Sequence, residues 1–142
     1  MKARIKGPQH LIGPIPQNDH LRLLLTIFRR MGAHSLRDAA ACNMMMQHLG
    51  SAYRRPYLLM QAMMLDLSRH CRINLTIAPS CCRRMTTDEA QLIAIITATE
   101  TNPQRAMTLL SDLTGNAECH AILATIDAVK EAFASLGRPL VE

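Results

Sequence analysis

Apolar residues recur along most of this chain at the spacing of an amphipathic helix. Between Leu21 and Phe28 they stand at i, i+3, i+4 and i+7, which places them on one face of a helix. Similar stripes follow, and capping residues, glycines and prolines separate one stripe from the next. We therefore predict six helices, at residues 18–32, 35–50, 56–71, 87–99, 102–115 and 117–137.

One stretch has a different period. Ile73, Leu75 and Ile77 alternate with polar residues, which is the pattern of a half-buried strand, so residues 72–78 are expected to be extended. A single strand cannot satisfy its own backbone N–H and C=O groups. Its partner is therefore the amino-terminal arm, a second copy of the same strand, or water.

The expected fold class is all-α, as a single compact bundle of about six helices with one short extended segment. Residues 1–17 contain glycines and prolines without a helical period. We therefore expect an extended N-terminal arm there and a single helical domain at residues 18–142. Aromatic residues make up only 3% of the sequence and there are 10 methionines, so the core must be filled by Leu, Ile, Ala and Met, which suit helices.

The helix at residues 87–99 is expected at the centre of the bundle. Thr86 and Glu89 have the spacing of a capping box, in which each side chain bonds the backbone N–H of the other residue. One side of the helix is covered by the large apolar residues Leu92, Ile93, Ile95 and Ile96, and the other by alanines. Both sides therefore need neighbours.

Two adjacent cysteines, Cys81 and Cys82, precede this helix. Neighbouring arginines and the positive end of a helix favour a thiolate, so the pair is a candidate redox site. It is also a candidate metal site with His70, Cys71 and His34, although the spacing is not the tight one typical of zinc. The third interpretation is structural, because free cysteines are among the most buried residues.

The net charge of +5 is unevenly distributed. Residues 1–84 carry 13 Lys and Arg against 3 Asp and Glu, whereas residues 85–142 carry 3 against 8. Either the two halves pack against each other, within the domain or across a dimer, or the basic half forms a face for an anionic partner. The candidate anion-binding residues are three arginine pairs, Arg29 and Arg30, Arg54 and Arg55, and Arg83 and Arg84.

Among these pairs, Arg83 and Arg84 suit an anion best because they precede a helix N-terminus. Nucleic acid is less favoured as the partner. Only Tyr53 and Tyr57 stand near an arginine pair for stacking, and the sequence shows no recognition-helix pattern. We therefore expect an acidic protein or another anionic ligand as the partner.

No catalytic motif stands out in the sequence. It has no nucleophile elbow, zinc-protease motif or glycine-rich phosphate loop. We therefore expect a small non-enzymatic binding or regulatory protein, without a cofactor unless the cysteine pair holds a metal ion. The longest apolar run, residues 57–67, is too short to cross a bilayer. The odd number of cysteines, 5, and a start without a secretory signal favour the cytoplasm.

The helix at residues 56–71 is apolar on two sides. Methionines form one side, and Leu58 and Leu65 lie on the other. A helix of this kind is either central or part of a subunit interface. Together with the unpaired extended segment, it leads us to expect a homodimer.

Several strings in the chain resemble a family of short, uncharacterised bacterial proteins with an all-helical fold. They are FRRMGAHSLRDA at residues 28–39, Arg54-Arg55-Pro56, and Ile77-Ala78-Pro79 leading into Cys81-Cys82, Arg84-Met85-Thr86 and Glu89. Gly137-Arg138-Pro139 fits the same pattern, so the resemblance covers almost the whole chain. Similar proteins tend to carry more cysteines before the fourth helix, where this chain has Ser80. The resemblance implies no activity and assigns no residue roles.

Overall fold

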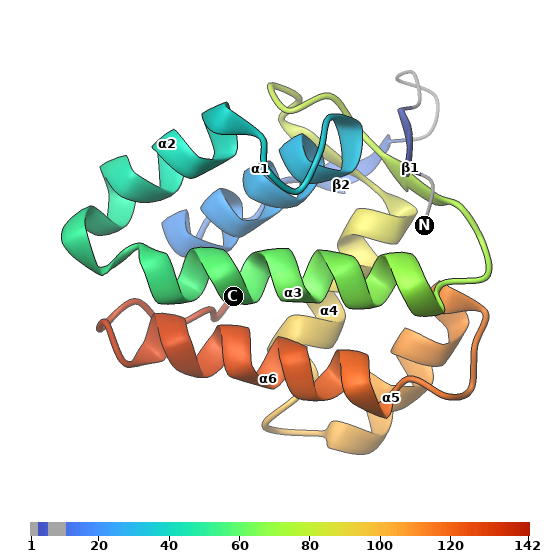
Figure 1. The fold of residues 1–142 in the computed structure, drawn as a ribbon. Helices are drawn as coiled ribbons and strands as arrows, with labels where there is room; N and C mark the ends of the chain where they lie inside the picture. The colour runs from blue at the N-terminus through green and yellow to red at the C-terminus, as the bar shows by residue number, and fades with distance from the viewer. Residues whose placement is uncertain (1–2, 6–10) are drawn as a thin grey trace.

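The computed structural model describes residues 3–5 and 11–142, and helices make up most of that part (Figure 1). The described residues form six α-helices, as predicted for an all-α chain: α1 (Asp19–Ala33), α2 (Ala39–Leu49), α3 (Arg54–His70), α4 (Thr87–Ala98), α5 (Pro103–Thr114) and α6 (His120–Ala134). A short 3₁₀ turn, η2 (Gly50–Ala52), joins α2 to α3. The same part of the chain holds four short strands, β1 (Ala3–Ile5), β2 (Leu11–Pro14), β3 (Leu75–Ile77) and β4 (Arg84–Thr86).

The strands form two separate pairs that join the N-terminal arm to the segment before α4. β1 runs parallel to β3, with Ala3 opposite Leu75 and Ile5 opposite Ile77. β2 runs antiparallel to β4, with an irregularity between Leu11 and Gly13. Of the three partners considered for the extended segment, the arm of the same chain is the one observed. The segment thus gives no reason to expect a dimer.

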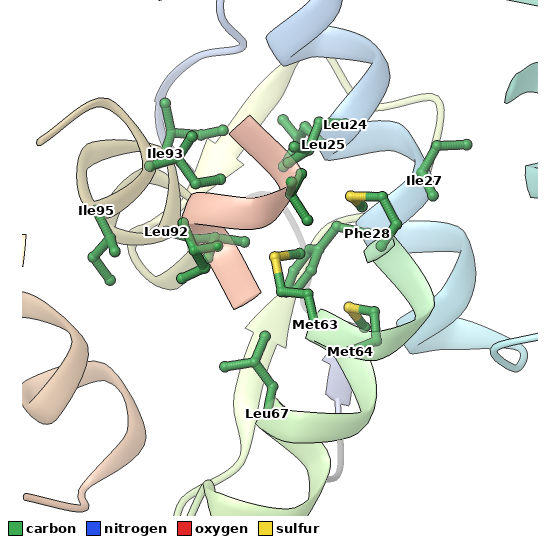
Figure 2. Packing of buried hydrophobic residues seen from close by; sticks show 14 of the residues in the cluster. Leu24, Leu25, Ile27, Phe28, Met63, Met64, Leu67, Leu92, Ile93 and Ile95 are labelled. Atoms are coloured by element: carbon green, nitrogen blue, oxygen red, sulfur yellow. The ribbon is translucent and has the colours of Figure 1, made fainter. Parts of the chain in front are cut away.

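The long helices pack in pairs around one hydrophobic core. α3 lies along α6, α4 along α5, and α1 beside α2 (Figure 1). Figure 2 shows side chains of α1, α3 and α4 gathered in one cluster, with Phe28, Met63 and Leu92 among them. Four large apolar residues of α4 are buried, as its predicted central position requires: Leu92, Ile93, Ile95 and Ile96.

Side-chain caps set the beginnings of the helices. The Asn18 side chain accepts hydrogen bonds from the backbone N–H groups of His20 and Leu21, and Asn102 accepts one from Arg105. Such caps satisfy N–H groups that have no partner inside the helix. The two asparagines begin α1 and α5 where the sequence placed those helices.

Helix α2 begins later than residue 35, where its start was predicted from the sequence. Asp38, and not Ser35, caps the helix, because the Asp38 carboxylate accepts from the Ala41 N–H at 2.9 Å. The buried side chains are Ala41, Met45 and Leu49. Met46 is 46% exposed, because its position is 100° round the helix from Met45.

A substitution on α4 tests the central position of this helix. Leu92 is fully buried, so Leu92→Ala is expected to lower the free energy of unfolding by about 2–5 kcal/mol through lost burial and a residual cavity. Urea denaturation followed by circular dichroism measures this loss. The matched control is Met46→Ala on α2, where the side chain is 46% exposed and the change should stay within about 0.5 kcal/mol. Equal effects of the two substitutions would contradict the packing described above.

Candidate functional site

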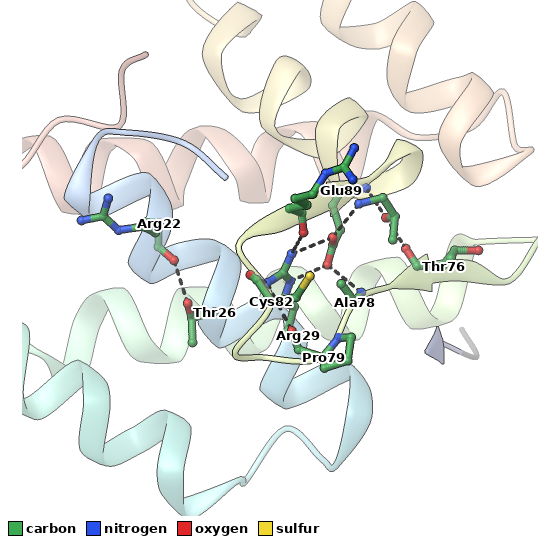
Figure 3. Close-up of polar contacts among 10 residues, drawn as sticks. Arg22, Thr26, Arg29, Thr76, Ala78, Pro79, Cys82 and Glu89 are labelled. Atoms are coloured by element: carbon green, nitrogen blue, oxygen red, sulfur yellow. Dashed lines mark hydrogen bonds and ion pairs between the residues drawn. The ribbon is translucent and has the colours of Figure 1, made fainter. Parts of the chain in front are cut away.

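A buried ion pair joins α1 to α4 beside the connection between β3 and β4 (Figure 3). The Arg29 side chain is 2% exposed and that of Glu89 is 0% exposed. Arg29 Nε donates to Glu89 Oε2 at 2.7 Å, and Nη2 donates to Oε1 at 3.0 Å. The pair is therefore bidentate, the geometry in which a guanidinium and a carboxylate bind most strongly.

The remaining donors of Arg29 hold the connection between β3 and β4, which we call the cysteine loop (residues 78–83). Nη1 donates to the Cys82 carbonyl oxygen at 2.7 Å and to that of Pro79 at 3.3 Å. Nη2 donates to the carbonyl oxygen of Arg84, directly after the loop, at 2.7 Å. A guanidinium has five N–H donors, and in Arg29 each of them has an acceptor.

Glu89 completes the same network from the other side. Besides Arg29, its carboxylate accepts from the backbone N–H of Ala78 at 3.1 Å and from that of Thr86 at 2.9 Å. The Glu89 N–H in turn donates to the Thr86 hydroxyl, which donates to the Thr76 carbonyl oxygen. The predicted capping box is thus confirmed, and its carboxylate also binds the backbone at the start of the cysteine loop and at the end of β4.

This network constrains the arrangement of the cysteine loop more than it adds to the free energy of unfolding. Taking two charges out of water costs several kcal/mol per ion, so a buried pair contributes little beyond a well-packed apolar substitute. Losing one partner is different, because the other charge is then left buried and uncompensated. The pair therefore allows one arrangement of the cysteine loop and penalises others.

The cysteine loop presents a thiol and positive charge to solvent. Cys81 and Arg83 are exposed, as is Arg84 next to the loop, whereas Cys82 is half-buried. A turn closed by the Cys82 N–H and the Pro79 carbonyl oxygen, 3.0 Å apart, shapes the loop. Arg84 also donates to the Leu11 carbonyl oxygen at 3.2 Å, which links the site to β2.

A small pocket of about 200 Å³ lies between the cysteine loop and the end of α1. Pro79 and Ser80 line it from the loop, and Arg30 and His34 from the end of α1. The Arg30 guanidinium is bound to the Asp38 carboxylate through two hydrogen bonds of 2.9 and 3.0 Å. This contact lowers the pKa of Asp38 below its usual range, so Asp38 stays charged in mild acid and keeps Arg30 in place.

The arginine pairs named from the sequence have different surroundings. Arg29 was wrongly proposed for anion binding, because it is buried and its donors are taken inside the protein. Arg55 pairs with Glu131 on α6, whereas Arg54 is exposed beside it. These two residues begin α3, at the left of Figure 1, and the cysteine loop lies at the top. The three pairs do not form one surface.

The proposed metal ligands are not brought together either. Among residues 3–5 and 11–142, no group of three or more His, Cys, Asp and Glu side chains is arranged to hold a metal ion. Cys71 donates its thiol proton to the Ile73 carbonyl oxygen, and burial raises the pKa of that thiol. The set of His70, Cys71, Cys81 and Cys82, with His34 as the further ligand, is therefore not assembled.

The paired role of Arg29 and Glu89 was missed from the sequence, although a signal was present. Arg29 stands four residues after Leu25 and eight after Leu21, on the apolar face of α1. Glu89 stands three residues before Leu92, on the apolar face of α4. A charge on a buried face needs a partner of opposite charge. Two residues of opposite charge on the apolar faces of different helices therefore indicate an ion pair.

Fold and site together define a small all-α protein in which a buried ion pair holds a cysteine-bearing loop in position. The chain belongs to the family of unknown function DUF6628, whose model matches residues 5–137. This confirms the resemblance to an uncharacterised family. No curated protein and no solved structure matches the chain. In the described residues, every helix is too short or too polar to span a bilayer.

The buried pair can be tested by removing one charge. Glu89→Gln keeps a residue that is able to complete a capping box but leaves the Arg29 charge buried without a counter-charge. We expect the free energy of unfolding to fall by about 3–5 kcal/mol, as measured by urea denaturation. The control is Glu100→Gln at an exposed position, with an expected change within about 0.5 kcal/mol. A loss for Glu89→Gln no larger than that of the control would contradict the network.

Thiol reactivity tests the geometry of the cysteine loop. Cys81 is exposed, Cys42, Cys71 and Cys82 are half-buried, and Cys119 is fully buried. Iodoacetamide should therefore label Cys81 first and Cys119 only on unfolding, because access limits the reaction. Labelling is measured site by site by mass spectrometry, with glutathione as the free-thiol reference. Protection of Cys81 equal to that of Cys119 would contradict the structure.

Proposed function

We propose that this protein is a small non-enzymatic binding protein that recognises an acidic segment of another protein through its cysteine loop. The observation that carries the proposal is that three of the five Arg29 donors bind backbone carbonyl groups in this one connection or directly after it, while the other two bind the buried Glu89 carboxylate. Loops that carry function are commonly positioned by a rigid scaffold. A loop fixed before binding also loses less entropy when it meets its partner.

The charge around the loop supports an acidic partner. Arg83 and Arg84 are exposed, and residues 78–87 contain no Asp or Glu. The half-buried Asp88 carboxylate, which follows, accepts a hydrogen bond from the Thr76 backbone N–H. The nearest carboxylate in the network, Glu89, is buried and already neutralised by Arg29. A carboxylate-rich segment would therefore meet positive charge without an opposing surface carboxylate from residues 78–87.

Nucleic acid is a weaker candidate for the partner. Proteins that bind single strands stack the bases on aromatic rings. The chain has two Phe, two Tyr and no Trp. Phe28 and Phe133 are buried, whereas Tyr53 and Tyr57 lie beside each other at the start of α3, away from the cysteine loop. The loop thus lacks a surface for stacking.

A thiol function remains the second candidate, since Cys81 is exposed on a loop that also exposes Arg83. Labelling of Cys81 faster than glutathione at neutral pH would favour it. The homodimer and the cytoplasmic location remain predictions. The dimer is supported by Leu58 and Leu65 on α3, which are 60% and 36% exposed.

The proposed partner class is tested by charge reversal on the loop. The probe is a fluorescein-labelled Glu/Ser-rich peptide, and its binding is followed by fluorescence anisotropy at several salt concentrations. We expect Arg83→Glu to weaken binding about tenfold, which corresponds to about 1.4 kcal/mol. Affinity for the native protein should fall steeply with salt. Arg83 has no side-chain partner in the described part of the chain, so its loss should leave the fold intact.

The control variant is Arg105→Glu on α5, which makes the same charge change at another exposed position. It should alter the affinity by less than about twofold, because α5 lies away from the loop (Figure 1) and salt screens charges at a distance. If both variants weakened peptide binding equally, the loss would come from the change in net charge and not from the loop, and the proposal would be overturned. Tighter binding of a single-stranded oligonucleotide than of the peptide would overturn the choice of partner.

A further inference from the structure

A second, larger pocket lies between the first half of α1 and α2. Its volume is about 400 Å³. Asp19, Arg22 and Thr26 line it from α1 at one-turn spacing, and His48 lines it from the last turn of α2. Arg138 lines it from the C-terminal segment. None of these residues touches the cysteine loop in any contact described above, so this pocket is separate from the site of the proposed function.

Positive and titratable groups dominate the lining. Arg22 and Arg138 are permanent cations, and His20 and His48 add two imidazole rings. Asp19 is the only carboxylate among the lining residues, and it is bound to Arg22. That ion pair is well exposed, with 43% and 74% of the two side chains accessible, so solvent screens it strongly.

Among the described residues, the lining offers one free donor, the Arg138 guanidinium, and one free ring nitrogen, Nε2 of His48, which is an acceptor in the neutral imidazole. The Arg138 side chain has no hydrogen bond or ion pair to the described residues, although its backbone N–H donates to Phe133. His48 Nδ1 lies 3.0 Å from the Met44 carbonyl oxygen, so this nitrogen carries a proton and Nε2 is left for another partner. The Thr26 hydroxyl is already used, because it donates to the Arg22 carbonyl oxygen at 2.9 Å (Figure 3).

We propose that this pocket binds a small molecule that carries a phosphate group. Guanidinium groups match phosphate oxygens in geometry as well as in charge, and two of them reach the pocket from different segments. The volume lies in the range of small-molecule sites, about 300–1,000 Å³. Leu23 and Met44 supply a small apolar patch for the carbon part of the ligand. None of the described lining residues is Phe, Tyr or Trp, which favours a compact phosphate monoester over a nucleotide.

The turn after α6 explains why Arg138 reaches this pocket. Gly137 has a φ of 70°, a conformation that glycine adopts at little cost. The turn sends the chain back across the bundle, and Leu140 is buried in the core two residues after Arg138. Arg138 is thus held between two fixed points and contributes a charge that comes from neither α1 nor α2.

Isothermal titration with glycerol 3-phosphate at constant ionic strength tests the proposal. The native protein should bind it with saturation, and Arg138→Gln should weaken binding at least tenfold. Arg138→Lys, which keeps the charge, should weaken it less than Arg138→Gln does. The matched control is Arg105→Gln on α5, which should leave the affinity within twofold. In chloride buffer without the phosphate probe, the midpoint of thermal unfolding should be the same for all variants. The backbone hydrogen bond of residue 138 to Phe133 does not depend on its side chain.

Two-dimensional amide NMR with the same probe locates the bound phosphate. The expected shifts fall on residues 19–26, 44–48 and 138. Failure to saturate, an affinity unchanged in Arg138→Gln, or equal loss in Arg105→Gln would overturn the proposal. Shifts confined to residues 78–84 would also overturn it, since the anion would then occupy the cysteine loop. If the phosphate proposal fails in this way, the proposed binding of an acidic peptide by the cysteine loop is still decided by its own test.

Discussion

A guanidinium that leaves water must find an acceptor for each of its five N–H groups, and this requirement organises the part of the molecule where α1 meets α4. Arg29 meets it with one carboxylate and three backbone carbonyl groups. The carboxylate, from Glu89, has the same need for donors and takes two of them from the backbone. One pair of side chains thereby fixes the relative positions of α1, α4, β3 and β4.

The helices could be read from the sequence because their signals are local. Apolar periodicity and the caps at Asn18, Thr86 and Asn102 lie within the helices that they define. β2 and β4 could not be read this way. They are only four and three residues long, and their pairing joins segments far apart in the sequence. A strand of this length is defined by its partner more than by its own period.

The candidate site was partly predictable. The exposed Cys81 and the arginines next to it were identified as a distinctive group, and the structure places them on one loop. Adjacent arginines, however, point to sides of a helix that differ by 100°. Arg29 therefore faces the core and Arg30 the surface, although the sequence treats them as a pair. The uneven charge of the two halves has a similar explanation, since Arg29 and Arg55 find Glu89 and Glu131 in the acidic half.

The strand pairs of the N-terminal arm have a consequence for the order of events during synthesis. Ala3 and Leu11 leave the ribosome early, whereas their partners Leu75 and Thr86 follow only after three helices have been made. Pairings between such distant segments close late, because a long stretch of chain must first lose its freedom. The strands of the arm therefore stay unpaired while the first three helices are synthesised. A segment that is synthesised before the helices is thus among the last to pack.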